Sequence, residues 1–351
     1  MSVAFRELLK KVGSGVHTGK NLTREEAAAA TRMMLRQEAT PAQIGAFMIA
    51  HRIKRPTPEE LAGMLDAYDQ LGPKLPVKDE NSLPVTVFGI PYDGRSRTAP
   101  IIPITALILA TVGVLVVMHG GDRMPTKYGI PLIEIWQGLG VDFSALSLAQ
   151  TQQLFEKTGV GFVYIPQHFP LANDLVPYRD QIGKRPPTAT LELVWSPCAG
   201  NVHLVAGYVH PPTETRFRET LELRGASNFT LVKGLEGSCD LPRERTAIIT
   251  VSQFETNAGF ERLLLHPRDY GFDGKDVPFE SANELIAGMQ EVLQGKPSEL
   301  MSSAIWNGGF YLWRCGVCPD FPTGLAKAEA LLTAGDVARK LQEIVDIQHY
   351  K

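Results

Sequence analysis

The first 75 residues carry apolar side chains at helical spacing. In the stretches 44–48 and 61–68, apolar positions recur every three or four residues, which is typical of helices with one buried face. Gly72-Pro73 ends this pattern. We therefore predict a helical N-terminal domain over residues 1–76.

The starts of three of these helices are marked by short polar signatures. Each places Thr three residues before Glu or Gln, which is the capping box, and two also have Pro at the first helical position. The three stretches are TREE (23–26), TPAQ (40–43) and TPEE (57–60).

After residue 76 the pattern changes to short β-branched runs with helical stretches between most of them. This alternation predicts a larger α/β domain, residues 77–351, with a mostly parallel central sheet. Parallel sheets of this kind bind ligands at the carboxyl ends of their strands. The expected strands are 84–88, 114–118, 162–165, 203–208, 229–232 and 247–251.

One uncharged stretch has the length of a membrane span. Ile101–Met118 holds 18 residues without a charge, which is near the lower limit for a spanning helix. Pro103 and Gly113 interrupt it, so we expect a buried helix, a break at Gly113 and a buried strand, and no membrane contact. The N-terminal sequence MSVAFRELLKK lacks the apolar stretch of a signal peptide, and a cytoplasmic location is expected.

Composition argues against two classes of protein. The net charge of −3 argues against a general polyanion binder, so nucleic-acid binding would need a local basic patch. Four cysteines in 351 residues are too few for a disulfide scaffold. Cys315 and Cys318 have zinc or redox spacing, but zinc needs about four ligands. We expect reduced thiols in a turn between helices.

Two long segments resemble the anthranilate phosphoribosyltransferase family, of the glycosyltransferase family 3 type. They are LTREEAAAATRMMLRQEATPAQIGAFMIAHRIKRPTPEELAGMLDAY (22–68) and PYRDQIGKRPPTATLELVWSPCAG (177–200). The resemblance implies a small helical domain completed by a segment near 168–195, and a larger α/β domain. It further implies a homodimer through the N-terminal helices, and a transferase that uses phosphoribosyl pyrophosphate with Mg²⁺. The apolar residues Phe47, Met48, Met64 and Leu65 are expected to contribute to the dimer.

The motifs that bind diphosphate in that family are altered here. Its Gly-Thr-Gly-Gly-Asp loop corresponds to Gly89-Ile90-Pro91-Tyr92-Asp93, where proline removes an N–H and two glycines are lost. The side-chain donors of the following helix are replaced by Pro100–Ile104. The magnesium-binding Asp-Glu pair falls at Glu236-Gly237. Anthranilate phosphoribosyl transfer is therefore expected to be weak or absent.

Other positions match the family or add positive charge. By resemblance, Arg179 is the arginine that meets the carboxylate of the aromatic acid. Arg95, Arg97 and Arg123 are additional cations, which are expected to hold an anion between the turn 89–97 and the loop 119–127. The candidate ligand-binding residues are Gly89, Asp93, Gly94, Arg95, Arg97, His119, Gly120, Arg123, Lys127 and Arg179, and the candidate metal ligand is Glu236.

Seven of these candidates also have a purely structural interpretation. The loop cations are alternatively solvated surface charges. Arg179 is alternatively paired with Asp180 or Glu192. His119 alternatively satisfies backbone groups beneath the loop, and Glu236 is alternatively a turn residue.

Three functions remain open on the sequence alone. The first is the family's own reaction, and the second is a transferase or phosphorylase with a different phosphorylated ligand. The third is a non-catalytic homologue that binds single-stranded nucleic acid in a basic groove of the dimer.

Overall fold

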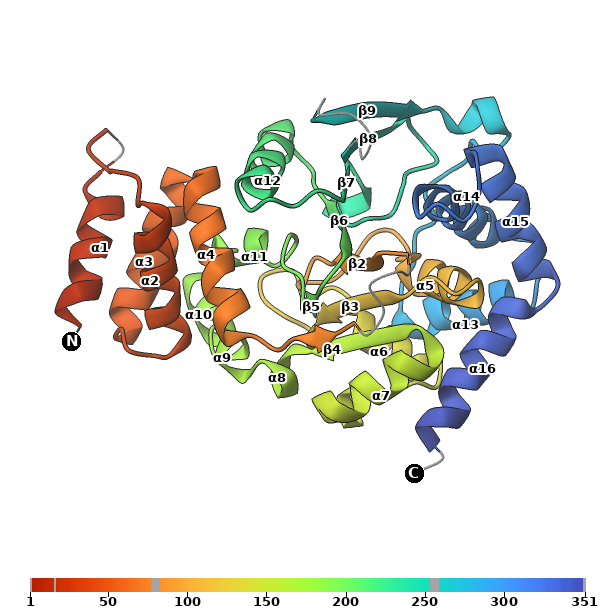
Figure 1. The fold of residues 1–351 in the computed structure, drawn as a ribbon, viewed down its shortest axis with the longest axis horizontal. Coiled ribbons are helices and arrows are strands. Elements are labelled where there is room, and N and C mark those ends of the chain that lie inside the picture. The colour runs from red at the N-terminus through yellow and green to blue at the C-terminus, as the bar shows by residue number, and fades with distance from the viewer. Residues whose placement is uncertain (1, 16, 78–82, 253–258, 350–351) are drawn as a thin grey trace.

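The computed structural model describes residues 2–15, 17–77, 83–252 and 259–349. The chain begins with a bundle of helices that stands to one side of the larger domain (Figure 1). The three predicted capping boxes are confirmed at Thr23, Thr40 and Thr57. The bundle helices are α1 (Val3–Gly13), α2 (Arg24–Leu35), α3 (Pro41–Lys54) and α4 (Pro58–Leu71).

A seven-stranded sheet forms the centre of the larger domain, in the order β4-β3-β2-β6-β7-β8-β9. The first five strands in this order are parallel, and β8 and β9 are antiparallel additions. All six predicted strands are present, whereas β9 was not predicted. The strands are β2 (Val85–Gly89), β3 (Val116–Gly120), β4 (Val160–Tyr164), β6 (Val202–Gly207), β7 (Phe229–Val232), β8 (Ala247–Ser252) and β9 (Phe260–Leu265).

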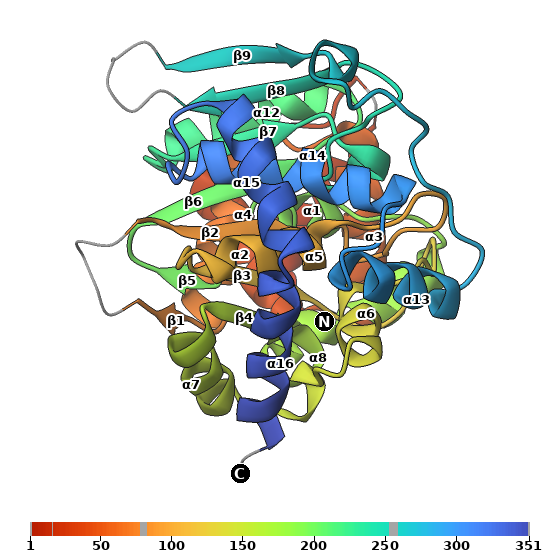
Figure 2. The same ribbon diagram turned by 90° about the vertical axis from the view of Figure 1, so that its right-hand side faces the viewer.

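Alternate residues of the central strand β2 face two different hydrophobic cores, because successive strand side chains point to opposite faces. Phe88 packs toward the helices of the C-terminal half. Val87 packs toward the N-terminal bundle. Figure 2 views the first of these faces. Its helices are α5 (Ile102–Thr111), α6 (Leu132–Gly138), α13 (Ala282–Leu293), α14 (Glu299–Arg314), α15 (Phe321–Thr333) and α16 (Asp336–His349).

The chain returns to the N-terminal bundle after β4. The hydroxyl of Tyr178 donates to Oε1 of Gln37 at 2.7 Å, and Nε of Arg52 donates to the carbonyl of Arg185 at 2.8 Å. The two-residue strands β1 (Leu75–Pro76) and β5 (Cys198–Ala199) pair where this segment leaves the bundle. The returning helices are α8 (Ile165–His168), α9 (Pro170–Asn173), α10 (Val176–Ile182) and α11 (Thr188–Leu191).

The remaining elements include α7 (Leu148–Thr158), α12 (Pro211–Leu223) and three short 3₁₀ turns. These turns are η1 (Phe143–Ala145), η2 (Leu235–Gly237) and η3 (Pro267–Tyr270). The uncharged stretch 101–118 forms α5 and the start of β3 as predicted. Among the described residues, no helix has the length and apolar character needed to span a membrane. Cys315 and Cys318 are free thiols in the turn between α14 and α15.

The residues expected to contribute to a dimer are buried within the single chain. Phe47, Met48, Met64 and Leu65 are each at most 2% exposed. That ground for the dimer is therefore wrong, because these side chains already pack in the core beneath the bundle.

Candidate functional site

A cleft of about 700 Å³ lies between the N-terminal bundle and the carboxyl ends of the sheet strands. The end of α3 and the returning segment 185–193 form its bundle side. The turns that follow β2, β6 and β7 form the other side. Its lining includes Arg52, Arg55, Arg185, Arg216, Asp93, Tyr92, Tyr208, His210 and Glu236.

The two predicted ligand loops are joined to each other at the edge of this cleft. Arg95 and Ile130 form an isolated antiparallel bridge, with N···O distances of 3.1 and 2.7 Å. Nζ of Lys127 donates to the carbonyl of Gly94 at 3.0 Å. A Cβ on Gly94 would come within 2.5 Å of the Gly129 backbone, and Gly94 has φ +74°. Glycine is thus required here for backbone packing.

Glu236 is the point where these loops converge. Its carboxylate accepts the backbone N–H groups of Ser96 (3.3 Å), Arg97 (3.0 Å) and Thr98 (3.0 Å). It also accepts hydrogen bonds from Nε of Arg95 and Nζ of Lys127. Burial acts to raise the pKa of Glu236, but the Lys127 hydrogen bond and the Arg95 charge outweigh it and hold the pKa well below its ordinary value.

The Arg95 guanidinium is buried and paired within the protein itself, and its expected ligand role stays a prediction. The residue is 3% exposed, and its guanidinium donates to Asp240 Oδ2 at 2.6 Å and Ser238 Oγ at 2.7 Å. Burial raises the pKa of Asp240, although the Arg95 charge acts against this. Arg95 therefore serves as an internal counter-ion that joins the two loops.

The other two added arginines lie further out. Arg123 donates from Nε and Nη2 to both carboxylate oxygens of Glu134 at 2.8 Å, on an exposed surface. Its expected role at the anion site is not supported, because its guanidinium is already engaged outside the cleft. The Arg97 side chain is 78% exposed and lies 3.7 Å from Glu236, and its ligand role stays a prediction.

His119 lies fully buried beneath the loop. Its Nε2 is 3.1 Å from the carbonyl of Trp195, and its Nδ1 contacts the hydroxyl of Tyr92. A carbonyl can only accept, so Nε2 carries the proton and Tyr92 donates to Nδ1. Burial lowers the pKa of His119 to about 3, so the ring is neutral. These contacts agree with the structural interpretation of His119, and its ligand role stays a prediction.

Of the remaining candidates, Gly89 and Gly120 lie at the ends of strands, whereas Asp93 lines the cleft. A Cβ on Gly89 would lie 1.8 Å from the carbonyl oxygen of Leu193, so this glycine allows the returning segment to pack against β2. A Cβ on Gly120 would approach only Phe162, at 3.6 Å. Asp93 lines the cleft and is 2.5 Å from Nη2 of Arg185, while burial raises its pKa.

Arg179 is an internal residue. It is 2% exposed and paired with Glu192, as one of the structural interpretations predicted. Burial raises the pKa of Glu192 to about 7, against the opposing Arg179 charge. The guanidinium is thus unavailable to an aromatic acid in this structure.

The arginines that do line the cleft were missed by sequence reasoning. Arg52 and Arg55 come from the end of α3, Arg185 from the returning segment and Arg216 from α12. Arg55 has φ +66°, which is uncommon for a residue other than glycine. No local motif unites these four, because they come together only when the two domains pack.

The described residues do not fit a magnesium–diphosphate site. Glu236 is surrounded by donors, and Asp240 is engaged by Arg95. Within the described ranges, no group of three or more His, Cys, Asp and Glu side chains could hold a metal. Magnesium prefers several oxygen ligands at once, and these residues do not offer them.

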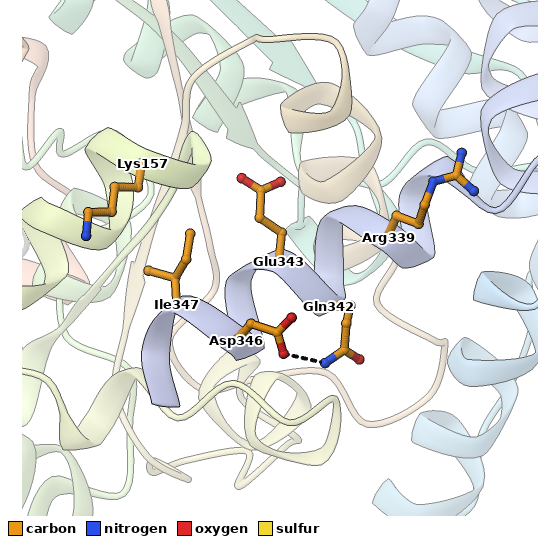
Figure 3. Close-up of a pocket in the computed structure, with 6 residues that line it drawn as sticks. All are labelled: Lys157, Arg339, Gln342, Glu343, Asp346 and Ile347. Carbon is orange, nitrogen blue, oxygen red and sulfur yellow. Dashed lines mark hydrogen bonds between the residues drawn. The ribbon is translucent and has the colours of Figure 1, made fainter. Parts of the chain in front are cut away.

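A second groove, of about 510 Å³, lies between α7 and α16 (Figure 3). Amide Nε2 of Gln342 donates to Asp346 at 2.8 Å, and Arg339 pairs with Asp336. The polar groups of α16 thus bond along their own helix. The groove is lined by Lys157, Arg339, Gln342, Glu343, Asp346 and Ile347.

The chain is similar to known proteins over nearly all its length. Residues 6–72 match a family model described as glycosyl transferase family, helical bundle domain, and residues 94–338 match the a/b domain model of that family. An anthranilate phosphoribosyltransferase of Chromobacterium violaceum is 26% identical over 330 residues, which cover 93% of this chain and 94% of that protein. An uncharacterized protein of Aquifex aeolicus is 28% identical, over 88% of this chain and 93% of that protein.

Two solved structures share the fold. Anthranilate phosphoribosyltransferase of Thermus thermophilus has a TM-score of 0.79 at 22% identity, covering 99% of both chains. The Saccharomyces cerevisiae enzyme in complex with PRPP and Mg has a TM-score of 0.84 at 15% identity, covering 99% of this chain and 98% of that one. At these identities the two structures establish the fold alone.

Proposed function

The chain belongs to the glycosyl transferase family that includes the anthranilate phosphoribosyltransferases, and we propose that it is a divergent member that binds a phosphorylated small molecule in its interdomain cleft. The ligand's phosphate is held by arginine side chains rather than by a glycine-rich loop and magnesium. Orthodox anthranilate phosphoribosyl transfer is weak or absent.

The observation that carries this proposal is a pair of guanidinium groups that line the cleft without a hydrogen-bonded or ion-paired partner among the described residues. Arg55 comes from the bundle and Arg216 from the α/β domain, and both line the same cleft. No hydrogen bond or ion pair to either guanidinium occurs within the described part of the chain. Burial, followed by the charge of Arg55, lowers the pKa of Arg216, and the carboxylates of Glu219 and Glu60 do not cancel this.

An oxyanion would relieve this repulsion. Guanidinium groups bind phosphate bidentately, and two of them from different domains would close on the same anion. Four arginines line the cleft against two carboxylates, Asp93 and Glu236. Asp93 is paired with Arg185 and Glu236 with the loop donors, so the charge left for a ligand to meet is positive.

The neighbouring loop argues against the family's own reaction. Pro91 has no N–H to offer a diphosphate. Tyr92 is buried against His119, so this turn does not form an open loop around a diphosphate. Arg179 is bonded to Glu192. These features support ligand binding without the usual diphosphate chemistry.

Single-stranded nucleic acid is the alternative ligand. Proteins that bind single strands combine basic grooves with exposed aromatic rings on which bases stack. The two tyrosines of this cleft, Tyr92 and Tyr208, are 5% and 2% exposed. A small phosphorylated molecule is therefore favoured over an oligonucleotide.

Calorimetric titration tests the proposal. The wild type and the double variant Arg55→Ala/Arg216→Ala are titrated with phosphoribosyl pyrophosphate and with a short single-stranded oligonucleotide, at two salt concentrations. Loss of two charge-assisted contacts should weaken binding of the small molecule by about tenfold or more.

Two further variants separate binding from folding. Arg123→Ala removes the same charge outside the cleft and should bind as the wild type does. Arg55→Gly removes the guanidinium while relieving the positive φ, so it should lose affinity without losing stability. The proposal fails if the wild type binds neither probe, or if the double variant binds as tightly as Arg123→Ala.

A further inference from the structure

The Glu236 carboxylate is surrounded by more donors than it can accept well. Besides three backbone N–H groups, Nε of Arg95 and Nζ of Lys127, the hydroxyls of Thr98 (3.1 Å) and Ser96 (3.5 Å) also reach it. That makes seven donors. A carboxylate offers about four lone-pair sites on its two oxygens. The donors around Glu236 therefore outnumber the lone pairs that can accept from them.

The same donors suit a phosphate group. Successive backbone N–H groups in a turn, together with cations, are the usual surroundings of phosphate in proteins. A terminal phosphate presents three strong acceptor oxygens in place of two. We call the donors of residues 95–98 and Lys127 the oxyanion cradle.

Glu236 is placed so that it could leave the cradle. It has φ +53°, an uncommon value for a non-glycine residue, and lies between Gly234 and Gly237, which has φ +81°. It also lines the interdomain cleft. Because its pKa is held low, the side chain stays charged at neutral pH, and only another anion can replace it without leaving the cradle uncompensated.

We propose that the oxyanion cradle is a masked phosphate-binding site, which Glu236 occupies in the free protein and which a ligand phosphate or diphosphate takes over by displacing Glu236. Glu236 is then an internal competitor for the ligand rather than a magnesium ligand. The inference rests on the proposed function in one respect, that phosphate reaches this cleft.

The consequence is a measurable loss of affinity in the wild type. Apparent affinity is the intrinsic affinity multiplied by the fraction of molecules in which the site is open. If Glu236 leaves the cradle in roughly a tenth of molecules or fewer, removing its carboxylate raises affinity by about tenfold or more.

The experiment is a titration with inorganic pyrophosphate, without divalent metal, of wild type, Glu236→Ala, Glu236→Gln and Glu134→Ala. Glu134→Ala removes one negative charge from the Arg123 pair outside the cradle. We expect Glu236→Ala to bind pyrophosphate at least about tenfold more tightly than the wild type, Glu236→Gln to gain part of this, and Glu134→Ala to gain none. Adding Lys127→Ala to Glu236→Ala should abolish the gain.

The inference is overturned if neither Glu236 variant binds more tightly than Glu134→Ala, or if the gain survives Lys127→Ala. Should Glu236→Ala fail to fold cooperatively, Glu236→Gln decides alone, since it keeps the size of the side chain. The Arg55→Ala/Arg216→Ala titration is read separately. A gain in the Glu236 variants with no loss in the arginine variant would sustain the masked site and refute the arginine-based function.

Discussion

Tyr92 donates its hydroxyl hydrogen to Nδ1 of His119 beneath the interdomain cleft. By the sequence resemblance, this tyrosine occupies the position of a loop glycine in the anthranilate phosphoribosyltransferases. Its ring and the histidine ring meet edge-on, with centroids 5.4 Å apart. The residue that replaces glycine thus forms part of the packed base of the loop. A phosphate cannot approach the backbone there as it could above an open glycine loop.

Removing this hydroxyl should destabilise the protein. In Tyr92→Phe, buried Nδ1 of His119 loses its donor, and we expect the free energy of unfolding to fall by about 1–3 kcal/mol. Urea denaturation measures the change. Tyr128→Phe is the control, because Tyr128 is 49% exposed and its hydroxyl bonds Asp180 at 2.8 Å on the surface. Equal losses in the two variants would contradict the assigned role of Tyr92.

Anthranilate phosphoribosyl transfer should be weak or undetectable. Each loss of a hydrogen-bond donor that stabilises charge developing in the transition state typically lowers the rate on the order of 10²-fold, and several such donors are lost together. We expect a rate at least about 10⁴-fold below that of the Chromobacterium violaceum relative, measured with phosphoribosyl pyrophosphate, Mg²⁺ and anthranilate. A turnover number of roughly 1 s⁻¹ or more, as in ordinary enzymes, would disprove this.

Acid should weaken the N-terminal bundle through Glu60. Burial acts to raise the pKa of this carboxyl, but His51, Lys54 and the backbone N–H of Leu22 lower it to about 2, from the ordinary 4.5. The pKa of Glu60 is lower in the folded protein than in the unfolded chain. The contribution of Glu60 to the free energy of unfolding is therefore complete above pH 4.5 and is lost as the pH falls toward 2. Glu60→Gln should cost on the order of 2 kcal/mol at pH 7.

Urea denaturation at pH 7, 4.5 and 3 checks this sign. The variant Glu60→Gln keeps an acceptor for the helix cap, as Gln43 does in α3. The stability that this variant loses therefore reports the effect of the negative charge alone. Glu59→Gln changes an exposed residue of the same turn and should change little. A wild type equally stable at all three pH values would refute the prediction.

A homodimer through the N-terminal helices remains a prediction, now on a different surface. A mostly apolar groove of about 730 Å³ runs between α1 and α3, lined in part by Val12, Ala46, Ile49 and Ile53. Ile53 is 64% exposed. Exposed apolar patches of this kind mark interfaces between proteins.

Sedimentation velocity at micromolar concentration tests the dimer. The wild type should sediment as a dimer and Ile53→Glu as a monomer, with unchanged thermal stability per chain. Leu264→Glu is the control, because Leu264 is 55% exposed on the edge strand β9. A monomeric wild type would refute the prediction.

The local elements could be predicted because their causes lie within a few residues. Thr57 and Glu60 satisfy each other's backbone N–H groups across one turn, so the start of α4 can be recognised in any context. The buried strands carry β-branched runs that have the same meaning wherever they occur. Strand β9 escaped prediction because most of its residues are exposed, and only pairing with β8 makes it a strand.

The sequence by itself determined the two-domain fold and the loss of the loop glycines. Tertiary structure decided what each charge does. Arg95 and Asp240 are 145 residues apart in sequence, yet lie within 2.6 Å. Arg55 and Arg216 are 161 residues apart in sequence, yet line the same cleft. Because charges attract or repel by their separation in space, and burial strengthens that effect, an arginine becomes a counter-ion or a ligand group only when the chain has folded.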